Sequence, residues 1–108
     1  MLAKKFRLPI QQWFKEKRKF ITRKSDFFIV RVSSNNLPYS RFGAIISLKV
    51  SKSAVLRNKI KRAIFNFIYS KKLHEVPGKD ILISVLPKAS ELTKQELEEK
   101  LKSLIPIY

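Results

Sequence analysis

The chain has 108 residues, 44% of them hydrophobic, and its 24 Lys and Arg against 8 Asp and Glu give a net charge of +16. This length predicts one domain over residues 1–108, and eight Phe, three Tyr and one Trp can supply one core. With no cysteine and one histidine, disulfides, thiol catalysis and cysteine or multi-histidine zinc sites are excluded. No apolar run approaches the roughly 18 residues of a membrane span, and no apolar signal core follows the basic N-terminus, so we predict a cytoplasmic protein without a membrane partner.

The charge is concentrated in the first two-thirds of the chain. Residues 1–74 carry 19 of the basic residues and two of the acidic ones, a net charge of +17, whereas residues 75–108 carry a net charge of −1. A surface of this charge favours a polyanionic partner, above all a phosphate backbone. We therefore expect the binding surface in residues 1–74 and a structural role for the rest.

The first half of the chain predicts a short helix followed by strands. Pro9 suits the first turn of a helix over residues 10–20. Residues 27–32 are aromatic and β-branched, which is typical of a strand, and residues 33–38 form a turn cluster. A second extended segment covers residues 42–50, and there is room for a third strand before the long helix that follows.

The longest predicted element is a helix from an N-cap at Ser51 or Ser53 to about Leu73. Its apolar residues recur at helical spacing and predict one side that faces the core, formed by Leu56, Ile60, Ala63, Ile64, Phe67 and Ile68. The adjoining arc is basic, with Lys59 further round, and carries Arg57, Asn58, Lys61 and Arg62. Phe65 and Tyr69 fall within this basic arc, where we expect no core contact.

The last third of the chain predicts a buried strand and a capped helix. Pro77-Gly78 interrupts the chain, and residues 81–86 form a mostly apolar run. Thr93 and Glu96 have the spacing of a capping box, and the helix that follows has an apolar face made of Leu97, Leu101, Leu104 and Ile105. The resulting order, α-β-β-(β)-α-β-α, predicts a small single-domain α+β sandwich.

Residues 57–62 are the strongest functional signal. Four cations and an amide fall within six residues, and no acidic residue stands at helical spacing to neutralise them. Salt bridges that serve solubility therefore explain the run poorly, and contact with nucleic acid is favoured. Near the N-terminus, Trp13, Phe14 and Phe20 lie among cations, where aromatic rings either form core or stack on single-stranded bases.

Residues suited to catalysis are sparse. Glu16 and Asp26 are the only carboxylates in residues 1–74, and we expect them to neutralise nearby cations. His74 is expected to be a surface histidine. Because acid–base chemistry needs paired groups with shifted pKa values, we predict no catalytic residue and no metal ligand in the protein itself.

The segment from Arg41-Phe42-Gly43 through Lys49 to Arg62 resembles the bacterial ribonuclease P protein subunit. That family has an Arg-x-Gly strand entry, a Lys-rich strand end and the motif Arg-Asn-Arg-x-Lys-Arg at the start of a long helix. Here the motif reads Arg57-Asn58-Lys59-Ile60-Lys61-Arg62, and size and element order also agree. The sequence departs from the family pattern by substitutions at Trp13, Val30, Leu48, Lys59 and Phe65.

The resemblance implies a place in an RNA-based enzyme. In this family a large RNA that holds Mg²⁺ hydrolyses one phosphodiester of precursor tRNA, while the protein binds the substrate's 5′ leader and stabilises the RNA. The implied partners are the ribonuclease P catalytic RNA and precursor tRNA, with Mg²⁺ held mainly by the RNA and no obligate protein partner. The implied fold is the ribonuclease P protein-like α-β sandwich, also found in the second domain of a small-subunit ribosomal protein, with a left-handed β-α-β crossover.

The resemblance also implies two groups of site residues. Contacts to the 5′ leader are implied for Phe14 and Val30, in a cleft formed by strands and the first helix. Contacts to RNA are implied for the cationic and amide residues Arg41, Lys49, Lys52, Arg57, Asn58, Lys59, Lys61 and Arg62.

Three other functions fit parts of the sequence. A small ribosomal or ribosome-associated protein would share the basic charge and the modest core, and the RNA that copurifies with the chain would distinguish it. A DNA-binding helix-turn-helix module fits less well, because the basic helix follows strands and lacks a short partner helix before a tight turn. A self-sufficient nuclease would need carboxylates or histidines that the basic region lacks.

Overall fold

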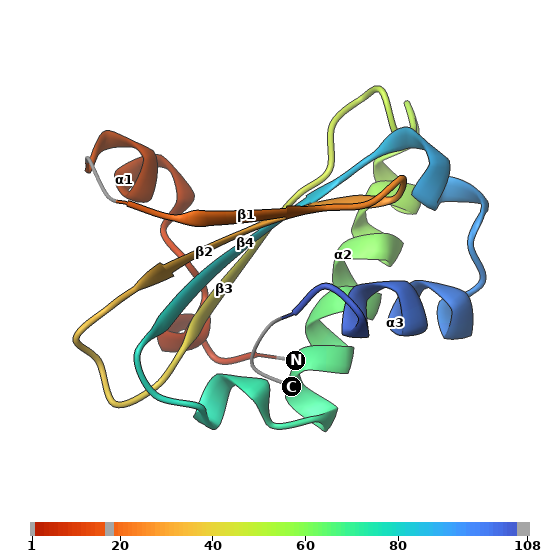
Figure 1. Cartoon of the computed structure of the whole chain (residues 1–108). Coiled ribbons are helices and arrows are strands. Elements are labelled where there is room, and N and C mark those ends of the chain that lie inside the picture. Colours follow the sequence, from red (N-terminus) through yellow and green to blue (C-terminus); the bar gives the residue numbers. More distant parts are fainter. Residues whose placement is uncertain (1, 17–18, 106–108) are drawn as a thin grey trace.

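The computed structural model describes residues 2–16 and 19–105, and Figure 1 shows its arrangement. Helices and strands follow the order α-β-β-β-α-β-α, as the sequence predicted, with short 3₁₀ helices (η) between them. In chain order the elements are η1 (Lys4–Phe6), α1 (Ile10–Lys15), β1 (Ile21–Lys24), β2 (Phe28–Ser34), β3 (Arg41–Ile45), α2 (Ala54–Ser70), η2 (Leu73–Glu75), β4 (Lys79–Val85), η3 (Pro87–Glu91) and α3 (Lys94–Lys102).

Several boundaries differ from those that the sequence predicted. The helix predicted over residues 10–20 ends at Lys15, and residues 17 and 18 lie outside the described part of the chain. The second extended segment ends at Ile45. The third strand is β1, which precedes both predicted strands; all four of its side chains are exposed, so its sequence lacks the alternation that marks a half-buried strand.

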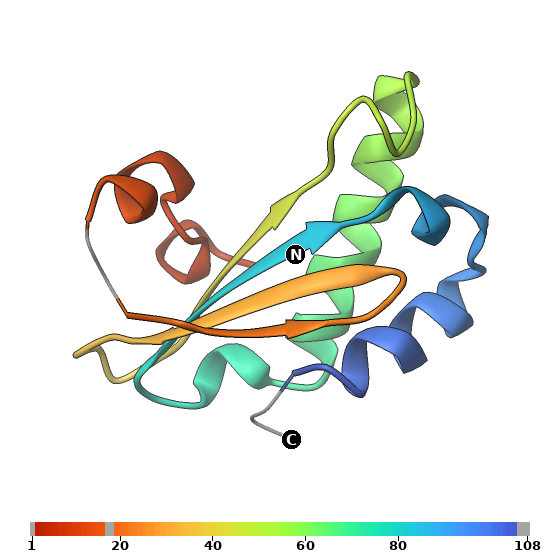
Figure 2. The ribbon, with the colours of Figure 1, turned by 45° about the horizontal axis from the view of Figure 1, so that its top comes forward.

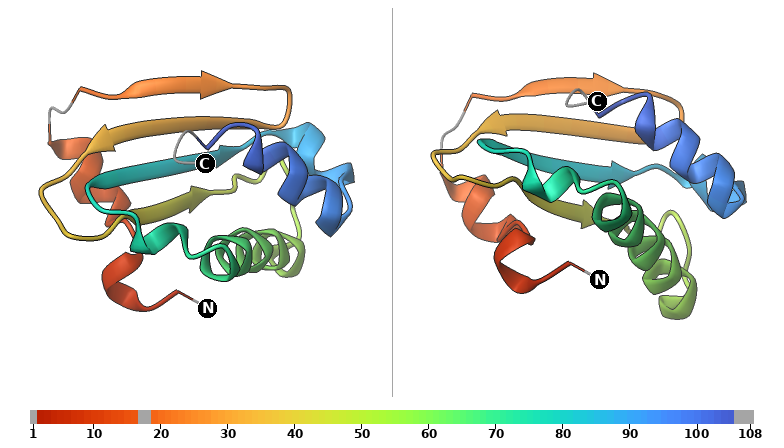
Figure 3. Two further views of the ribbon diagram at one scale, coloured as in Figure 1. Left: turned by 60° about the horizontal axis from the view of Figure 1, so that its bottom comes forward. Right: turned by 90° about the horizontal axis from the view of Figure 1, so that it is seen from below.

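The four strands form one sheet in the order β1-β2-β4-β3. β2 is antiparallel to both of its neighbours, whereas β3 and β4 are parallel and are joined through α2. In the views from the side of α2 and α3, the chain passes in front of the sheet from β3 to β4 as a left-handed crossover (Figure 3). This handedness is rare, because most β-α-β units are right-handed.

Side chains alternate between the two faces of the sheet, and each face has its own packing. The face toward α2 and α3 forms the main core, to which β2 contributes Phe28, Val30 and Val32 and β4 contributes Ile81, Ile83 and Val85. On the opposite face, α1 lies at one end of the sheet (Figure 2). A small second cluster on this face joins Leu8, Trp13 and Leu82.

Gly43 allows this second cluster to form. A Cβ atom at this position would lie 3.1 Å from Cγ1 of Ile10 and 3.2 Å from Cβ of Leu8. The backbone N–H of Leu8 donates a hydrogen bond to the carbonyl of Phe42 at 2.9 Å, so the chain before α1 runs directly along β3. The glycine of the Arg-x-Gly pattern is therefore a packing requirement of α1 on the sheet.

α2 begins at the predicted N-cap Ser53, whose Oγ accepts a hydrogen bond from the Leu56 N–H at 3.3 Å. Its buried residues are confined to the C-terminal half and are Ile64, Phe65, Phe67 and Ile68. Two sequence predictions are therefore wrong. Phe65 belongs to the core because the contacts of α2 extend around a wider arc than one apolar stripe, whereas Leu56 is 50% exposed because the first turns of α2 lie over an open groove.

These burials predict unequal costs of truncation along α2. Ile64→Ala should lower the free energy of unfolding by about 2–5 kcal/mol, because Ile64 is fully buried. Leu56→Ala should change it by less than about 1 kcal/mol, because half of the Leu56 side chain already contacts solvent. Chemical denaturation of both variants measures this difference, and similar losses for the two would contradict the assignment of the core to the C-terminal half of α2.

A buried ion pair links β3 to β4. The carboxylate of Asp80 is fully buried and accepts hydrogen bonds from Nε and Nη2 of Arg41 at 2.9 and 2.8 Å. Nδ2 of Asn35 donates a third hydrogen bond to Asp80 at 2.7 Å. The hydrogen bond with Asp80 raises the pKa of Arg41 above its ordinary value. Arg41, predicted as an RNA contact, is 20% exposed and is paired with Asp80, so it also has a structural role.

Arg41→Ala should therefore destabilise the fold. The substitution removes the cation from a buried carboxylate, a change that typically costs about 3–5 kcal/mol. Lys49→Ala is the matched control, because it removes an exposed cation from the same predicted RNA-binding group and should leave stability within about 0.5 kcal/mol of wild type. Denaturant unfolding compares the two variants. If Arg41→Ala were as stable as wild type but bound RNA weakly, Arg41 would act mainly as an RNA contact.

Candidate nucleic-acid interface

Most of the predicted RNA-binding residues come together at one end of α2. We call this group the basic surface: the N-terminal half of α2 and the loop before it, with Lys49, Lys52, Arg57, Asn58, Lys59, Lys61 and Arg62. All of these side chains are exposed except Arg57, which is half-buried. No acidic residue occurs in the sequence between Asp26 and Glu75. The basic surface therefore has no neutralising carboxylate on its own elements.

The placement of these cations opposes the electrostatics of the helix. The N-terminus of a helix carries partial positive charge, so acidic residues stabilise its first turn. α2 begins at Ala54 without an acidic residue in its first turn, and Arg57 and Lys59 are its fourth and sixth residues. Nη1 of Arg57 donates a 2.8 Å hydrogen bond to the carbonyl of Ser51, which holds the guanidinium beside the loop. Such a helix start attracts an anion, as phosphate-binding helices do.

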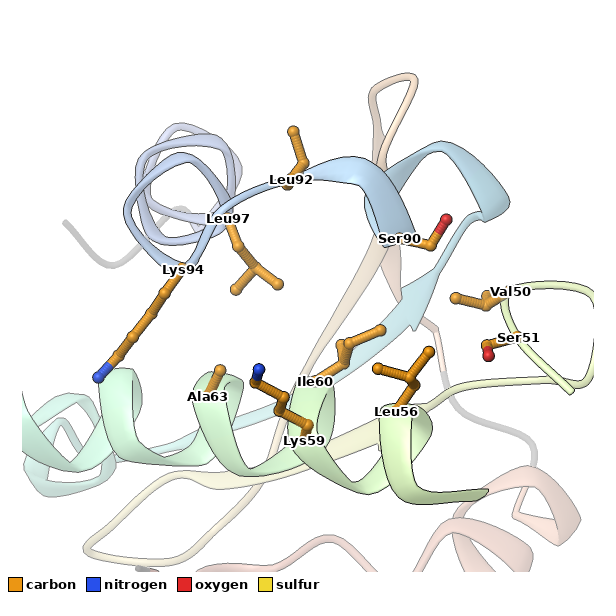
Figure 4. A pocket seen from close by; sticks show the side chains of 10 residues that line it. All are labelled: Val50, Ser51, Leu56, Lys59, Ile60, Ala63, Ser90, Leu92, Lys94 and Leu97. Atoms are coloured by element: carbon orange, nitrogen blue, oxygen red, sulfur yellow. The ribbon is translucent and has the colours of Figure 1, made fainter. Parts of the chain in front are cut away.

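A groove of about 340 Å³ lies between the start of α2 and α3. Figure 4 shows its lining, in which Leu56, Ile60 and Leu97 supply apolar walls. The side chains of Lys59 and Lys94 also line it, one from each helix. The exposed Leu56 therefore faces this groove and lies within the basic surface.

The face of the sheet opposite α2 carries exposed aromatic rings. Trp13 is buried, and its Nε1 donates a hydrogen bond to Oγ of Ser33 at 3.2 Å, so of the two roles that the sequence left open for this ring, the structure shows the core role. Phe14 and Phe20 are 54% and 46% exposed, and their ring centroids lie 5.2 and 5.7 Å from that of Trp13. We call the exposed rings of Phe14 and Phe20, which pack on the buried Trp13, the aromatic surface. Lys15 and Lys19, adjacent to these rings in sequence, are exposed.

Val30, implied as a leader contact, does not lie on this face. Its side chain is fully buried in the main core between β2 and the helices, so it cannot touch a ligand in this conformation. The alternation of β2 places the neighbouring Arg31 on the opposite face, where Nη1 donates to Oγ of Ser84 at 3.3 Å. The same alternation, read from the sequence, could have identified Arg31 as the residue exposed to this face.

The residues considered for catalysis are dispersed. His74 is buried, contrary to the sequence prediction, and its ring packs against those of Phe6 and Tyr69. Within residues 2–16 and 19–105, no three His, Asp or Glu side chains gather as a metal site requires. None of the helices in these ranges is long and apolar enough to span a membrane.

Comparison with known sequences gives consistent matches. A family model described as Ribonuclease P matches residues 3–108. A ribonuclease P protein component from Geobacillus thermodenitrificans is 31% identical over 102 residues, covering 93% of this chain and 84% of the relative. Another from Rippkaea orientalis is 39% identical over 87 residues, covering 75% and 68%.

Solved structures agree with the sequence matches. The RNase P protein of Staphylococcus aureus superposes with a TM-score of 0.80 at 29% identity, covering 94% of each chain. The RNase P protein of Thermotoga maritima, solved in complex with 1-(4-fluorophenyl)-2-thiourea, superposes with a TM-score of 0.76 at 28% identity, covering 90% of this chain and 94% of that one. The chain therefore belongs to the ribonuclease P protein family and is a protein component of ribonuclease P, the endoribonuclease of tRNA processing.

Proposed function

We propose that the chain binds the ribonuclease P RNA through the basic surface and the single-stranded 5′ leader of precursor tRNA through the aromatic surface. The observation that carries this proposal is the separation of two exposed surfaces of different chemistry on opposite faces of one sheet. In this proposal the RNA performs the hydrolysis, and the protein acts in the cytoplasm without an obligate protein partner.

The chemistry of the basic surface suits a folded RNA. Arginine and lysine contacts to phosphates fix the position of an RNA without reading its bases. Arg62 is exposed, so its planar guanidinium can form paired hydrogen bonds with a phosphate. Lys59 and Lys61 add mobile point charges on the same helix. These contacts suit a permanent RNA partner of defined shape.

The aromatic surface suits a strand of variable sequence. Stacking between an aromatic ring and a base is sequence-tolerant, because every base has a π-face. The ring contacts with Trp13 support Phe14 and Phe20, while about half of each side chain stays open to solvent. Precursor tRNAs differ in their leaders, so a contact that does not read sequence is the appropriate one.

Mg²⁺ in the proposed holoenzyme is held mainly by the RNA. Hydrolysis of a phosphodiester by metal ions needs ligands that orient the metal and the attacking water. Cations of the protein placed near the cleavage site would instead neutralise phosphates and so reduce the bulk Mg²⁺ that the RNA needs. The decisive experiment adds the protein to a bacterial ribonuclease P RNA and measures precursor-tRNA cleavage at low Mg²⁺, where we expect strong stimulation.

Arg62→Ala should weaken binding to the ribonuclease P RNA without altering the fold. Loss of one phosphate contact should reduce the slope of log affinity against log salt by about 0.7–0.9. Thermal stability should change by less than about 0.5 kcal/mol, because the side chain is exposed. Filter binding over a salt series gives the slope. Lys88→Ala, which removes an exposed cation on η3, is the control and should bind as wild type.

Phe14→Ala should weaken binding of precursor tRNA but not of mature tRNA. The substitution removes one stacking ring, a loss of about 1–3 kcal/mol that requires a leader. Phe14→Tyr keeps the ring and should retain the wild-type difference between the two tRNAs. The affinity of the reconstituted holoenzyme for both tRNA forms tests this, with circular dichroism to confirm folding. An equal loss for both forms would remove Phe14 from the leader site.

A further inference from the structure

Tyr69, near the C-terminal end of α2, is an exposed ring on a rigid support. It is 55% exposed, although it lies on a helix that packs against the core. Its ring stacks on the buried imidazole of His74, with centroids 5.5 Å apart and planes only 4° from parallel. The ring of Phe6 contacts the same imidazole at 4.7 Å. The buried His74 therefore fixes the orientation of Tyr69.

The backbone and neighbouring rings hold this support in place. The carbonyl of His74 accepts a 3.0 Å hydrogen bond from the N–H of Ser40, which anchors η2 to the start of β3. The rings of Phe6 and Tyr39 lie edge to face at 5.2 Å, and Nζ of Lys5 lies 4.9 Å from the first and 5.5 Å from the second. The ring cluster thus joins the N-terminal segment, the end of α2 and the loop before β3.

The segments that form the ring cluster carry exposed cations. Lys71 and Lys72 follow Tyr69 after Ser70, and Lys72, between α2 and η2, has the left-handed conformation with φ of 55°. Lys4 and Lys5 precede Phe6 in η1, and all four lysines are exposed. Residues 4–6 and 69–75 contain one acidic residue, Glu75, so the net charge of these two segments is +3. An exposed ring among cations matches the pattern that binds single-stranded nucleic acid.

Tyr69 also lies in line with the basic surface. Seven residues separate it from Arg62, which is within about 20° of two full helical turns. The two side chains therefore project from the same side of α2, about 10 Å apart along its axis. Asn58 lies on this side as well, one turn before Arg62, and both line a shallow hollow with Val55 and Lys61. Between Arg62 and Tyr69 the helix exposes Asn66, whereas Phe65 is buried. A nucleic-acid strand that runs from the basic surface to Tyr69 therefore passes over Asn66.

We propose that Tyr69 is a stacking site for an unpaired base of the RNA that binds along α2. The base lies on the ring face that His74 does not cover, and Lys71 and Lys72 contact the adjoining phosphates. This inference rests on the proposed binding of RNA by the basic surface, which it extends to the opposite end of the helix. Tyr69 would thus add a base contact to an interface that is otherwise made of charge.

Ultraviolet crosslinking of the holoenzyme with a bacterial ribonuclease P RNA tests the contact directly. Trypsin cleaves after Arg62 and Lys71, so Tyr69 is recovered in the peptide that spans residues 63–71. Phe65 and Phe67 in the same peptide are buried, so a nucleotide adduct should map to Tyr69. An adduct there supports the proposal. If peptides of the basic surface crosslink to the RNA but the peptide that spans residues 63–71 does not, the stacking site at Tyr69 is refuted.

Substitutions provide a second, quantitative test. Tyr69→Ala should reduce the affinity of the protein for the ribonuclease P RNA about tenfold. This loss should be the same whether precursor or mature tRNA is present. Tyr69→Trp keeps an aromatic face and should restore affinity, whereas Tyr69→Leu should not. If Tyr69 only shielded His74, Tyr69→Leu and Tyr69→Trp would bind the RNA equally well. The effect of Tyr69→Ala would then appear as a lower melting temperature in circular dichroism.

The outcomes separate this inference from the function on which it rests. Wild-type affinity in Tyr69→Ala together with weakened binding in Arg62→Ala would refute the stacking site and leave the proposed function intact. Failure of the wild-type protein to bind the RNA would refute both. If Tyr69→Ala does not fold, the crosslinking result on the wild-type holoenzyme decides.

Discussion

The packing of the C-terminal half of α2 on the sheet is the contact on which the other features depend. Ile64, Phe65, Phe67 and Ile68 are buried there, and the first turns of the same helix contain no fully buried residue. A helix anchored at one half presents its other half as a rigid extension. The packing thereby fixes the backbone from which the cations of the basic surface project, while their side chains, apart from the half-buried Arg57, stay exposed to a ligand.

The sheet separates two kinds of surface because its side chains alternate. Val30 and Val32 point into the main core, while Arg31 between them points to the opposite face. α1 packs on that opposite face through Leu8, Trp13 and the space that Gly43 leaves open. A thin sheet covered differently on its two sides can thus hold two RNA segments apart, at a distance set by the sheet and α2.

The sequence was sufficient for the parts of the fold that local chemistry decides. Ser53 caps α2, and Thr93 and Glu96 form the predicted capping box, because these signals lie within a few residues of one another. Features that depend on distant partners were missed. Arg41 pairs with Asp80 across 39 residues, and a cation at the start of a strand does not reveal that partner. Likewise, helical periodicity predicts on which side of α2 Phe65 and Leu56 lie, but it does not show how far the neighbouring elements cover that side.

Among the site residues, the charge run at 57–62 predicted an exposed cluster correctly, whereas the burial of Val30 and His74 required the three-dimensional packing.

The two hydrophobic clusters give the protein two separate reporters of its own structure. Trp13 is the only tryptophan in the sequence, and it lies in the small cluster under α1 rather than in the main core. Its fluorescence therefore reports the docking of α1, whereas far-ultraviolet circular dichroism is dominated by the longer α2. A short helix held by few contacts can open at a lower free energy than the whole domain. Melting curves from the two signals would then separate, and the gap between them measures how independently the aromatic surface can detach from the rest of the fold.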